Sequence, residues 1–161
     1  MIHSFEPVID SECDILILGT MPGVQSLNKQ QYYGNKQNAF WRITYRLFDE
    51  DMSDNYEERK SFLLRHHIAL WDVLKACERE GSLDSDIKNP IPNDFENLFK
   101  YHSLIKHVYF NGSHAQILFN RYVMKKIDVT DLEFIKLPST SPANTLKFEK
   151  KLEEWKNILK K

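Results

Sequence analysis

The sequence predicts an α/β protein built on a mostly parallel sheet. Strand-like apolar runs recur at residues 14–19, 68–73, 107–111 and 134–137, and helical patterns lie between them. Strands that alternate with helices favour a parallel sheet, because each crossover helix returns the chain to the same end of the sheet. A chain of 161 residues fits one domain, so we expect residues 1–161 to form a single unit with a closed core.

Composition narrows the class of protein. Hydrophobic residues make up 42% of the chain, which excludes a disordered protein, and no apolar run approaches the ~20 residues of a membrane-spanning helix. The first seven residues lack the basic and apolar regions of a secretory signal, so we expect a cytoplasmic protein. Cys13 and Cys77 are too far apart for a metal knuckle or a redox pair, and we expect reduced core thiols. A net charge of −1 argues against a protein that coats bulk nucleic acid.

In the first half of the chain we expect a tight turn and two helices. The strand at 14–19 ends in the Gly/Pro turn 19–23. Asn38 is the expected N-cap of the first helix, because the apolar residues at 40, 43, 47 and 48 form a stripe at three-and-four spacing. A second helix is expected within 53–67. Residues 70–74 look like a strand that passes into a short helix, followed by the polar loop 79–85.

In the second half, residues 89–93 contain two prolines and are expected to form a turn. Asn93 and Glu96 have the spacing of a capping box for a helix to about residue 104, and Ser113 and Gln116 have the same spacing for a helix through residue 122. The C-terminal helix is expected from about residue 145. Its core-facing stripe is 148, 152, 155 and 159, and its lysines are expected to be mostly exposed.

Polar clusters follow the predicted strands. A parallel sheet would gather 20–23, Asp72, Asn111 and 138–141 at one edge, where open α/β sheets bind ligands. The chain has no dinucleotide fingerprint, Walker lysine, nucleophile elbow or metal-ligand spacing. Such a site would work with amides, hydroxyls, backbone N–H groups and aromatic faces. That inventory suits recognition of a flat heterocycle and stabilisation of a leaving group.

Five separated blocks, in order along the chain, resemble the uracil-DNA glycosylase superfamily, and most closely its hypoxanthine-DNA (deoxyinosine) glycosylase branch. The blocks are 19–23, 32–33 with 38–41, 79–85, 110–112 and 138–142. The resemblance implies a three-layer α/β/α sandwich around a four-stranded parallel sheet. It also implies a monomeric enzyme without metal or other cofactor that hydrolyses the N-glycosidic bond of a deaminated base flipped out of DNA. Hypoxanthine is the first expected substrate and uracil the next.

The resemblance also assigns roles to single residues. Asn38 matches the amide that positions and polarises the attacking water, although it could serve only as a helix cap. Asn111 matches an asparagine that hydrogen-bonds the base, although it could merely shape the turn before Gly112. An amide carries a donor and an acceptor, which suits a keto purine edge. Tyr33 matches the aromatic residue that stacks on the flipped base, and a structural tyrosine is the alternative.

Further residues are expected around the base and the DNA backbone. Backbone N–H groups near Thr20 and Met21, with Pro22 and Gly23, would form the pocket wall.

Phe40 is counted with the base pocket, although it and Trp41 also open the apolar stripe of the first helix, and Asp72 is counted there in a minor role. The residues expected to contact the minor groove and the phosphates are Ser139, Thr140, Ser141 and Pro142.

The chain also departs from its relatives. Met21 stands where some relatives carry an asparagine or aspartate, Leu137 replaces a histidine, and Ser141 replaces a leucine wedge. A thioether cannot orient water, so the catalytic role is expected to move to Asn38. Two rival interpretations remain: an inert nucleic-acid-binding protein of the same fold, and an unrelated nucleotide-handling enzyme, which should carry a phosphate cradle or a metal set.

Overall fold

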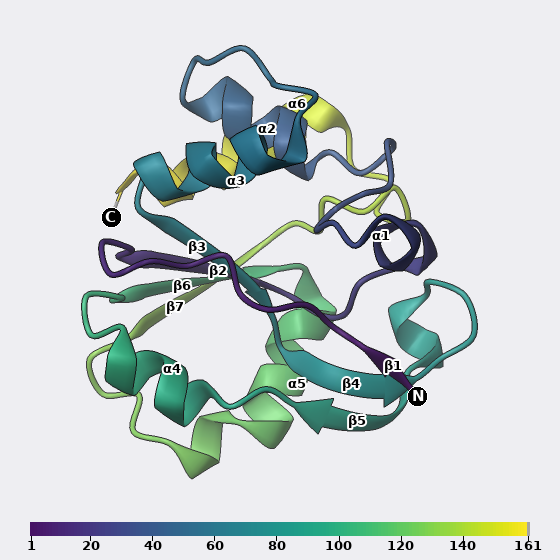
Figure 1. Cartoon of the computed structure of the whole chain (residues 1–161), viewed down its shortest axis with the longest axis vertical. Helices are drawn as coiled ribbons and strands as arrows, with labels where there is room; N and C mark the ends of the chain where they lie inside the picture. The colour runs from purple at the N-terminus through teal and green to yellow at the C-terminus, as the bar shows by residue number, and fades with distance from the viewer. Residues whose placement is uncertain (161) are drawn as a thin grey trace.

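A computed structural model describes residues 1–160 and contains a four-stranded parallel sheet between two layers of helices (Figure 1). The spatial order of the strands is β3 (Ile68–Asp72), β2 (Ile15–Gly19), β6 (His107–Asn111) and β7 (Glu133–Leu137). Every neighbouring pair is parallel, and Gly19 lies in register with Asp72. The predicted α/β/α sandwich and its four strands are therefore confirmed.

Two helical layers cover the two faces of the sheet. Helices α2 (Phe40–Leu47), α3 (Tyr56–Arg65) and α6 (Phe148–Trp155) lie on one face, and α4 (Phe95–Tyr101) and α5 (Ser113–Tyr122) lie on the other (Figure 1). Side chains of β2 alternate between two cores, because Ile15 and Ile17 face the first layer while Leu16 and Leu18 face the second. A parallel sheet that is covered on both faces has such uniformly apolar strands.

A second, antiparallel sheet stands beside the first and was not predicted. It consists of β1 (Ile2–His3), β4 (Leu74–Glu78) and β5 (Lys88–Pro92) in the order β1-β4-β5. The expected short helix near 70–74 is wrong, because residues 74–78 form β4 and pair with β1 and β5. The expected turn at 89–93 is also wrong. Its prolines fit β5 because an edge strand leaves one row of N–H groups unpaired and the pairing with β4 is irregular.

The predicted helix caps are wrong in position, and Ala39 rather than Asn38 is the N-cap of α2. Asn55 caps α3 by accepting from the Glu58 N–H at 3.0 Å. Asp94, rather than Asn93, caps α4, which ends at Tyr101 instead of about residue 104.

Helix α5 spans the predicted residues, although Gly112, with a φ of 96°, precedes it in place of a capping box. Three short elements were not predicted: α1 (Val24–Lys29) and the 3₁₀ turns η1 (Asp84–Asp86) and η2 (Met124–Lys126).

The C-terminal helix begins later than predicted, at Phe148. It tightens into a 3₁₀ turn, η3 (Lys156–Lys160), which changes the phase of the stripe, so Ile158 is buried and Leu159 is exposed. Lys151 departs from the expected exposed lysine face because only 5% of it is exposed. Cys13 and Cys77 are buried and free. Within residues 1–160, no helix is long and apolar enough to cross a membrane.

Candidate active site

A cavity of about 640 Å³ opens at the carboxyl edge of the parallel sheet. The segments that follow all four strands line it, namely 19–26 after β2, Asp72 at the end of β3, Asn111 at the end of β6 and 139–144 after β7. The connections from β2 and β6 leave toward opposite helical layers, and ligands bind at such switch points. The predicted gathering of polar clusters at one edge is therefore what the structure contains.

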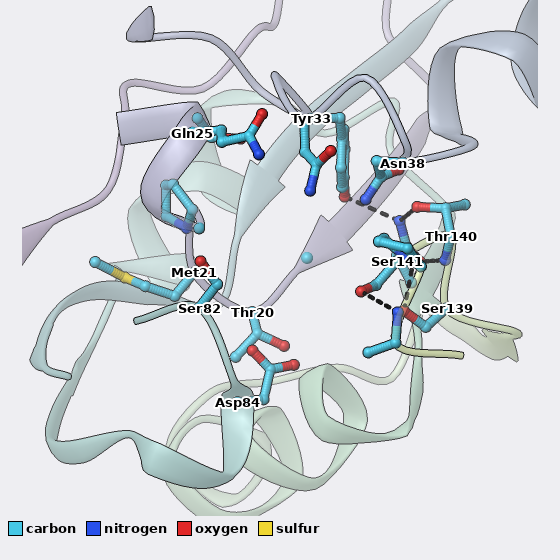
Figure 2. Close-up of a pocket in the computed structure, with 18 of the residues that line it drawn as sticks. Thr20, Met21, Gln25, Tyr33, Asn38, Ser82, Asp84, Ser139, Thr140 and Ser141 are labelled. Carbon is cyan, nitrogen blue, oxygen red and sulfur yellow. Dashed lines mark hydrogen bonds between the residues drawn. The ribbon is translucent and has the colours of Figure 1, made fainter. Parts of the chain in front are cut away.

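The wall after β2 depends on the absence of a side chain at Gly19. A Cβ atom there would lie 2.6 Å from Asp72 Oδ1 and 2.9 Å from the Tyr33 hydroxyl oxygen. Met21 lines the cavity, but its side chain is nearly buried within the core on the α4/α5 side and points away from Asn38 and Tyr33 (Figure 2). The thioether of Met21 therefore packs in the core and takes no part in the polar lining of the cavity.

An aromatic pair forms the side of the cavity nearest α2. The Tyr33 ring stacks on the Phe40 ring with centroids 4.2 Å apart and an interplanar angle of 22°. Phe40 is 0% exposed and does not line the cavity, so it supports Tyr33 and cannot touch a ligand there. Tyr33 has a φ of 54°, a conformation that is strained for a bulky residue. Of the described non-glycine residues with positive φ, Tyr33 is the one that lines this cavity, as is common at binding sites.

Asn111 is held by three hydrogen bonds. Its Nδ2 donates to the Tyr33 hydroxyl at 3.1 Å and to Thr140 Oγ1 at 2.9 Å, and its Oδ1 accepts from the Thr140 N–H at 2.9 Å (Figure 2). A backbone N–H can only donate, so the Thr140 bond fixes which end of the amide is oxygen. Both N–H groups of the amide are committed, and Oδ1 keeps one free lone pair.

Asn38 lines the cavity, but it is not the predicted N-cap of α2, because Ala39 holds that position. Its Oδ1 instead accepts from the Phe40 N–H at 2.9 Å, from one residue before the cap. This hydrogen bond orients the amide, and Oδ1 keeps a second lone pair that can accept from a water molecule.

The loop after β7, residues 138–144, is anchored by four hydrogen bonds that three residues donate. Trp155 Nε1 donates to the Pro138 carbonyl at 2.9 Å, and the Ala39 N–H donates to the Thr140 carbonyl at 3.0 Å. Lys151 Nζ donates to the carbonyls of Ser141 at 3.2 Å and Asn144 at 3.0 Å. The C-terminal helix therefore holds this loop against the cavity.

Within this loop, Thr140 departs from the expected DNA contact. It is 1% exposed, and its N–H and hydroxyl bond Asn111 instead. Ser139 Oγ accepts from the Ser141 N–H, and Ser141 Oγ accepts from the Ala143 N–H, so both hydroxyl protons are left to donate. Pro142 is exposed at the rim.

Two carboxyl groups line the cavity, and burial is the largest cause of the shift in both. Burial and the nearby Asp84 raise the pKa of Asp72 to about 7, while Arg79 opposes the shift. Burial also raises the pKa of Asp84, and His114, Arg79 and a hydrogen bond with Thr20 oppose it. Figure 2 shows the Asp84 carboxyl beside Thr20. The floor of the site thus carries less negative charge near neutral pH than two ordinary carboxylates would.

The segment between β4 and β5, residues 79–87, lies against the wall after β2 and lines the cavity through residues 82–84. Arg79 donates through Nη2 to the Pro22 carbonyl and through Nε to the Gly81 carbonyl. Ser82 Oγ accepts from the Val24 N–H at 2.9 Å. Residues 79–85 were one of the five resembling blocks, yet no site residue was predicted from it.

Several lining residues escaped prediction altogether: Gln25, Ser26, Asn35, Ser82, Asp84 and Asn144. Ser82 and Asp84 could have been found from the sequence, because they lie in the polar loop 79–85 that follows the strand-like residues 70–74. Within residues 1–160, no cluster of three or more histidine, cysteine or acidic side chains could hold a metal ion.

Comparison with known proteins agrees with this geometry. A family profile described as the uracil DNA glycosylase superfamily matches residues 6–161. The chain belongs to this superfamily.

A protein named hypoxanthine DNA glycosylase from Methanosarcina barkeri is 47% identical over 111 residues, which covers 68% of this chain and 70% of that protein. A protein of the same name from Methanosarcina acetivorans is 37% identical over 163 residues, which covers 98% of both. A solution NMR structure of a candidate uracil DNA glycosylase from Methanosarcina acetivorans has a TM-score of 0.81 at 36% identity, and the match covers 97% of this chain and 94% of that one.

Lys151→Met tests the anchor of the 138–144 loop. The substitution keeps an unbranched apolar stem but removes the donor to the Ser141 and Asn144 carbonyls, so the loop should open more often. We expect roughly tenfold faster hydrogen exchange of amides in 138–144, measured by mass spectrometry. Lys150→Met, at an exposed neighbour, is the matched control. Equal exchange in the two variants would show that Lys151 does not anchor the loop.

Proposed function

We propose that this protein is a monofunctional DNA glycosylase that hydrolyses the N-glycosidic bond of deaminated bases, with hypoxanthine as the preferred base. The observation that carries the proposal is the arrangement of Tyr33, Asn38 and Asn111 around one cavity in a chain of this superfamily. The names of both curated relatives support hypoxanthine as the base. DNA is the proposed partner. A monomer in the cytoplasm stays a prediction from the sequence.

Tyr33 and Asn111 receive the flipped base. The base stacks on Tyr33, whose position is fixed from behind by Phe40, and stacking contributes about 1–3 kcal/mol for any base. The free lone pair of Asn111 Oδ1 accepts the N–H that hypoxanthine and uracil carry beside a carbonyl. Adenine and cytosine have an unprotonated ring nitrogen there, so two acceptors would face each other. This oxygen thus favours a deaminated base over its parent.

Asn38 and the wall after β2 serve the chemistry. The sugar departs as an oxocarbenium-like species, which needs an oriented water more than a strong base. Asn38 Oδ1 accepts one hydrogen of that water while the Phe40 N–H holds the amide in place. Backbone N–H groups near Thr20 and Met21 stabilise charge on the departing base. Pro22 and Gly23 keep this wall free of bulky side chains.

Ser139, Ser141 and Pro142 contact the DNA backbone and the minor groove as neutral groups. Thr140 acts behind them as the partner of Asn111. An inert binding protein of the same fold is the remaining alternative, and it differs in one measurable property: it would bind DNA that contains a deaminated base without cleaving the glycosidic bond.

A substrate panel tests the proposal directly. Duplexes that carry hypoxanthine, uracil, xanthine or adenine at one position are incubated with enzyme in excess, treated with alkali and resolved on a gel. We expect excision of hypoxanthine to be fastest, uracil to follow, and adenine to be left intact. Binding of every duplex without strand cleavage would identify the inert alternative.

Asn38→Ala should lower the single-turnover excision rate by at least about 10²-fold, because a catalytic proton or water contact contributes about that much. Binding of a duplex with an uncleavable deoxyinosine analogue should change little. Asn55→Ala is the matched control, since it removes the cap of α3 and costs about 1 kcal/mol of stability without touching the cavity. Equal rates in the two variants would leave Asn38 with only a structural role, as the acceptor for the Phe40 N–H.

Asn111→Ala should slow excision of hypoxanthine by roughly 10- to 100-fold more than excision of unsubstituted purine, which lacks the N–H that Asn111 accepts. Thr140→Val is the comparison, because it keeps the backbone N–H to Asn111 and removes only the Oγ1 partner. We expect Thr140→Val to slow both bases equally. The same equal loss in Asn111→Ala would show that Asn111 is only structural.

A further inference from the structure

Asp72 is a buried acid with an unused oxygen at the floor of the cavity. It ends β3, lines the cavity beside Gly19 and is 4% exposed. Its Oδ1 lies against the Cα side of Gly19, which tolerates no Cβ because of that contact. Its Oδ2 is sealed from solvent and finds no hydrogen-bond partner within residues 1–160. An ionised carboxylate with a buried oxygen that has no partner is costly, so this environment favours the protonated form of Asp72 at the cavity wall.

The charges that face Asp72 come from several elements. Asp84, in the 3₁₀ turn η1 (Asp84–Asp86), discourages the ionised form of Asp72, and Arg79 encourages it. The phenols of Tyr32, Tyr33 and Tyr56 also interact with Asp72, since their pKa values are raised by burial first and by the charge of Asp72 in addition. Burial is the largest cause and raises the pKa of Asp72 to about 7. A proton is therefore available on this group at neutral pH, as in other apolar sites that keep a carboxyl neutral.

We propose that Asp72 is the general acid for purine excision, and that it donates its carboxyl proton to N7 of hypoxanthine as the glycosidic bond breaks. The inference rests on the proposed glycosylase function and adds a leaving-group step to it. The other carboxyl group that lines the cavity, Asp84, is the weaker candidate, because His114, Arg79 and a hydrogen bond with Thr20 all favour its ionised form. Asn38 and Asn111 do not titrate, and burial raises the pKa of the Tyr33 phenol far above neutral pH.

The step balances in atoms and charge. The C1′–N9 bond breaks and its electron pair goes to the base, while the proton of Asp72 moves to N7 and neutralises the base. The water held by Asn38 forms the new bond to C1′ and releases one proton. That proton restores the carboxyl group of Asp72 through solvent after the base has left.

This step also explains a preference for purines. Uracil has no imidazole nitrogen, so a proton donor aimed at N7 gives it no help, and uracil must leave as an anion stabilised by hydrogen bonds alone. The chain carries Leu137 where uracil-specific relatives are expected to place a histidine, so that anion receives no imidazole donor here. The site would therefore assist purine excision by protonating the leaving base. It would assist pyrimidine excision only by holding the base and the water in place and by hydrogen bonds to the leaving anion.

Single-turnover rates as a function of pH test the proposal. For wild-type protein on hypoxanthine, we expect the rate to fall as pH rises through about 7, because Asp72 loses its proton there. On uracil, this decline should be absent. Asp72→Asn keeps the size of the side chain but has no proton to transfer, so its rate on hypoxanthine should be about 10²-fold lower and flat across this range.

Asp86→Asn is the matched control. Asp86 is an exposed acid in η1, the 3₁₀ turn that also contains Asp84, and it does not line the cavity. We expect it to keep the wild-type profile. An unchanged alkaline decline in Asp72→Asn would overturn the role of Asp72 while leaving the glycosylase function intact. Absence of excision by wild-type protein on any base would overturn both.

A second measurement uses wild-type protein alone, in case Asp72→Asn does not fold. With 7-deazahypoxanthine, which lacks N7, the remaining excision should be independent of pH near 7. Persistence of the decline on this base would assign it to another group and overturn the proposal. Where Asp72→Asn does fold, its rate on 7-deazahypoxanthine should equal that of wild type.

Discussion

The hydrogen bonds of Asn111 are the interaction on which the rest of the site depends. One amide at the end of β6 joins the loop before α2, through the Tyr33 hydroxyl, to the loop after β7, through Thr140. Asn111 is 8% exposed, so this amide must be satisfied inside the protein. Tyr33, which has a positive φ, presents its ring to the cavity, and the Phe40 ring stacks on it from the core side. A single buried amide thus sets the geometry of three chain segments.

A site of amides with reduced negative charge suits the chemistry of a flipped nucleotide. DNA arrives with phosphates, so fixed negative charge at the floor would oppose its entry, and burial raises the pKa of Asp72 to about 7 and also raises that of Asp84. Met21 contributes no polar group, because its side chain packs into the core. The polar group proposed to align water is Asn38, on another side of the cavity, and the Phe40 N–H orients its Oδ1.

Local sequence patterns predicted the parallel sheet, whereas the parts of the fold that depend on long-range pairing were missed. The four parallel strands followed from apolar runs, and the gathering of Asp72, Asn111 and 138–141 followed from parallel strand direction. The antiparallel sheet was missed because residues 88–92 read locally as a proline turn, and only pairing with β4 makes them a strand.

The same limit applies to the site. Nothing near Thr140 in sequence shows that its partner is 29 residues away, and nothing near Lys151 shows that it lies under the Ser141 carbonyl. Phe40 could be placed on the apolar stripe of α2, but its position behind Tyr33 depends on the fold of the loop between them. Even the cap of α2 lies one residue later than predicted, at Ala39 instead of Asn38, and roles that depend on a distant partner were not accessible from the sequence.

A crystal structure of the protein bound to a duplex with 2′-fluoro-2′-deoxyinosine, which resists cleavage, would be the most direct test. Hypoxanthine should stack on Tyr33 with its N1–H on Asn111 Oδ1, and a water molecule on Asn38 Oδ1 should face C1′ of the sugar. A base bound in this cavity with that water held by another side chain, or with Asn111 turned away from the base, would contradict the assignment of water alignment to Asn38 and base recognition to Asn111.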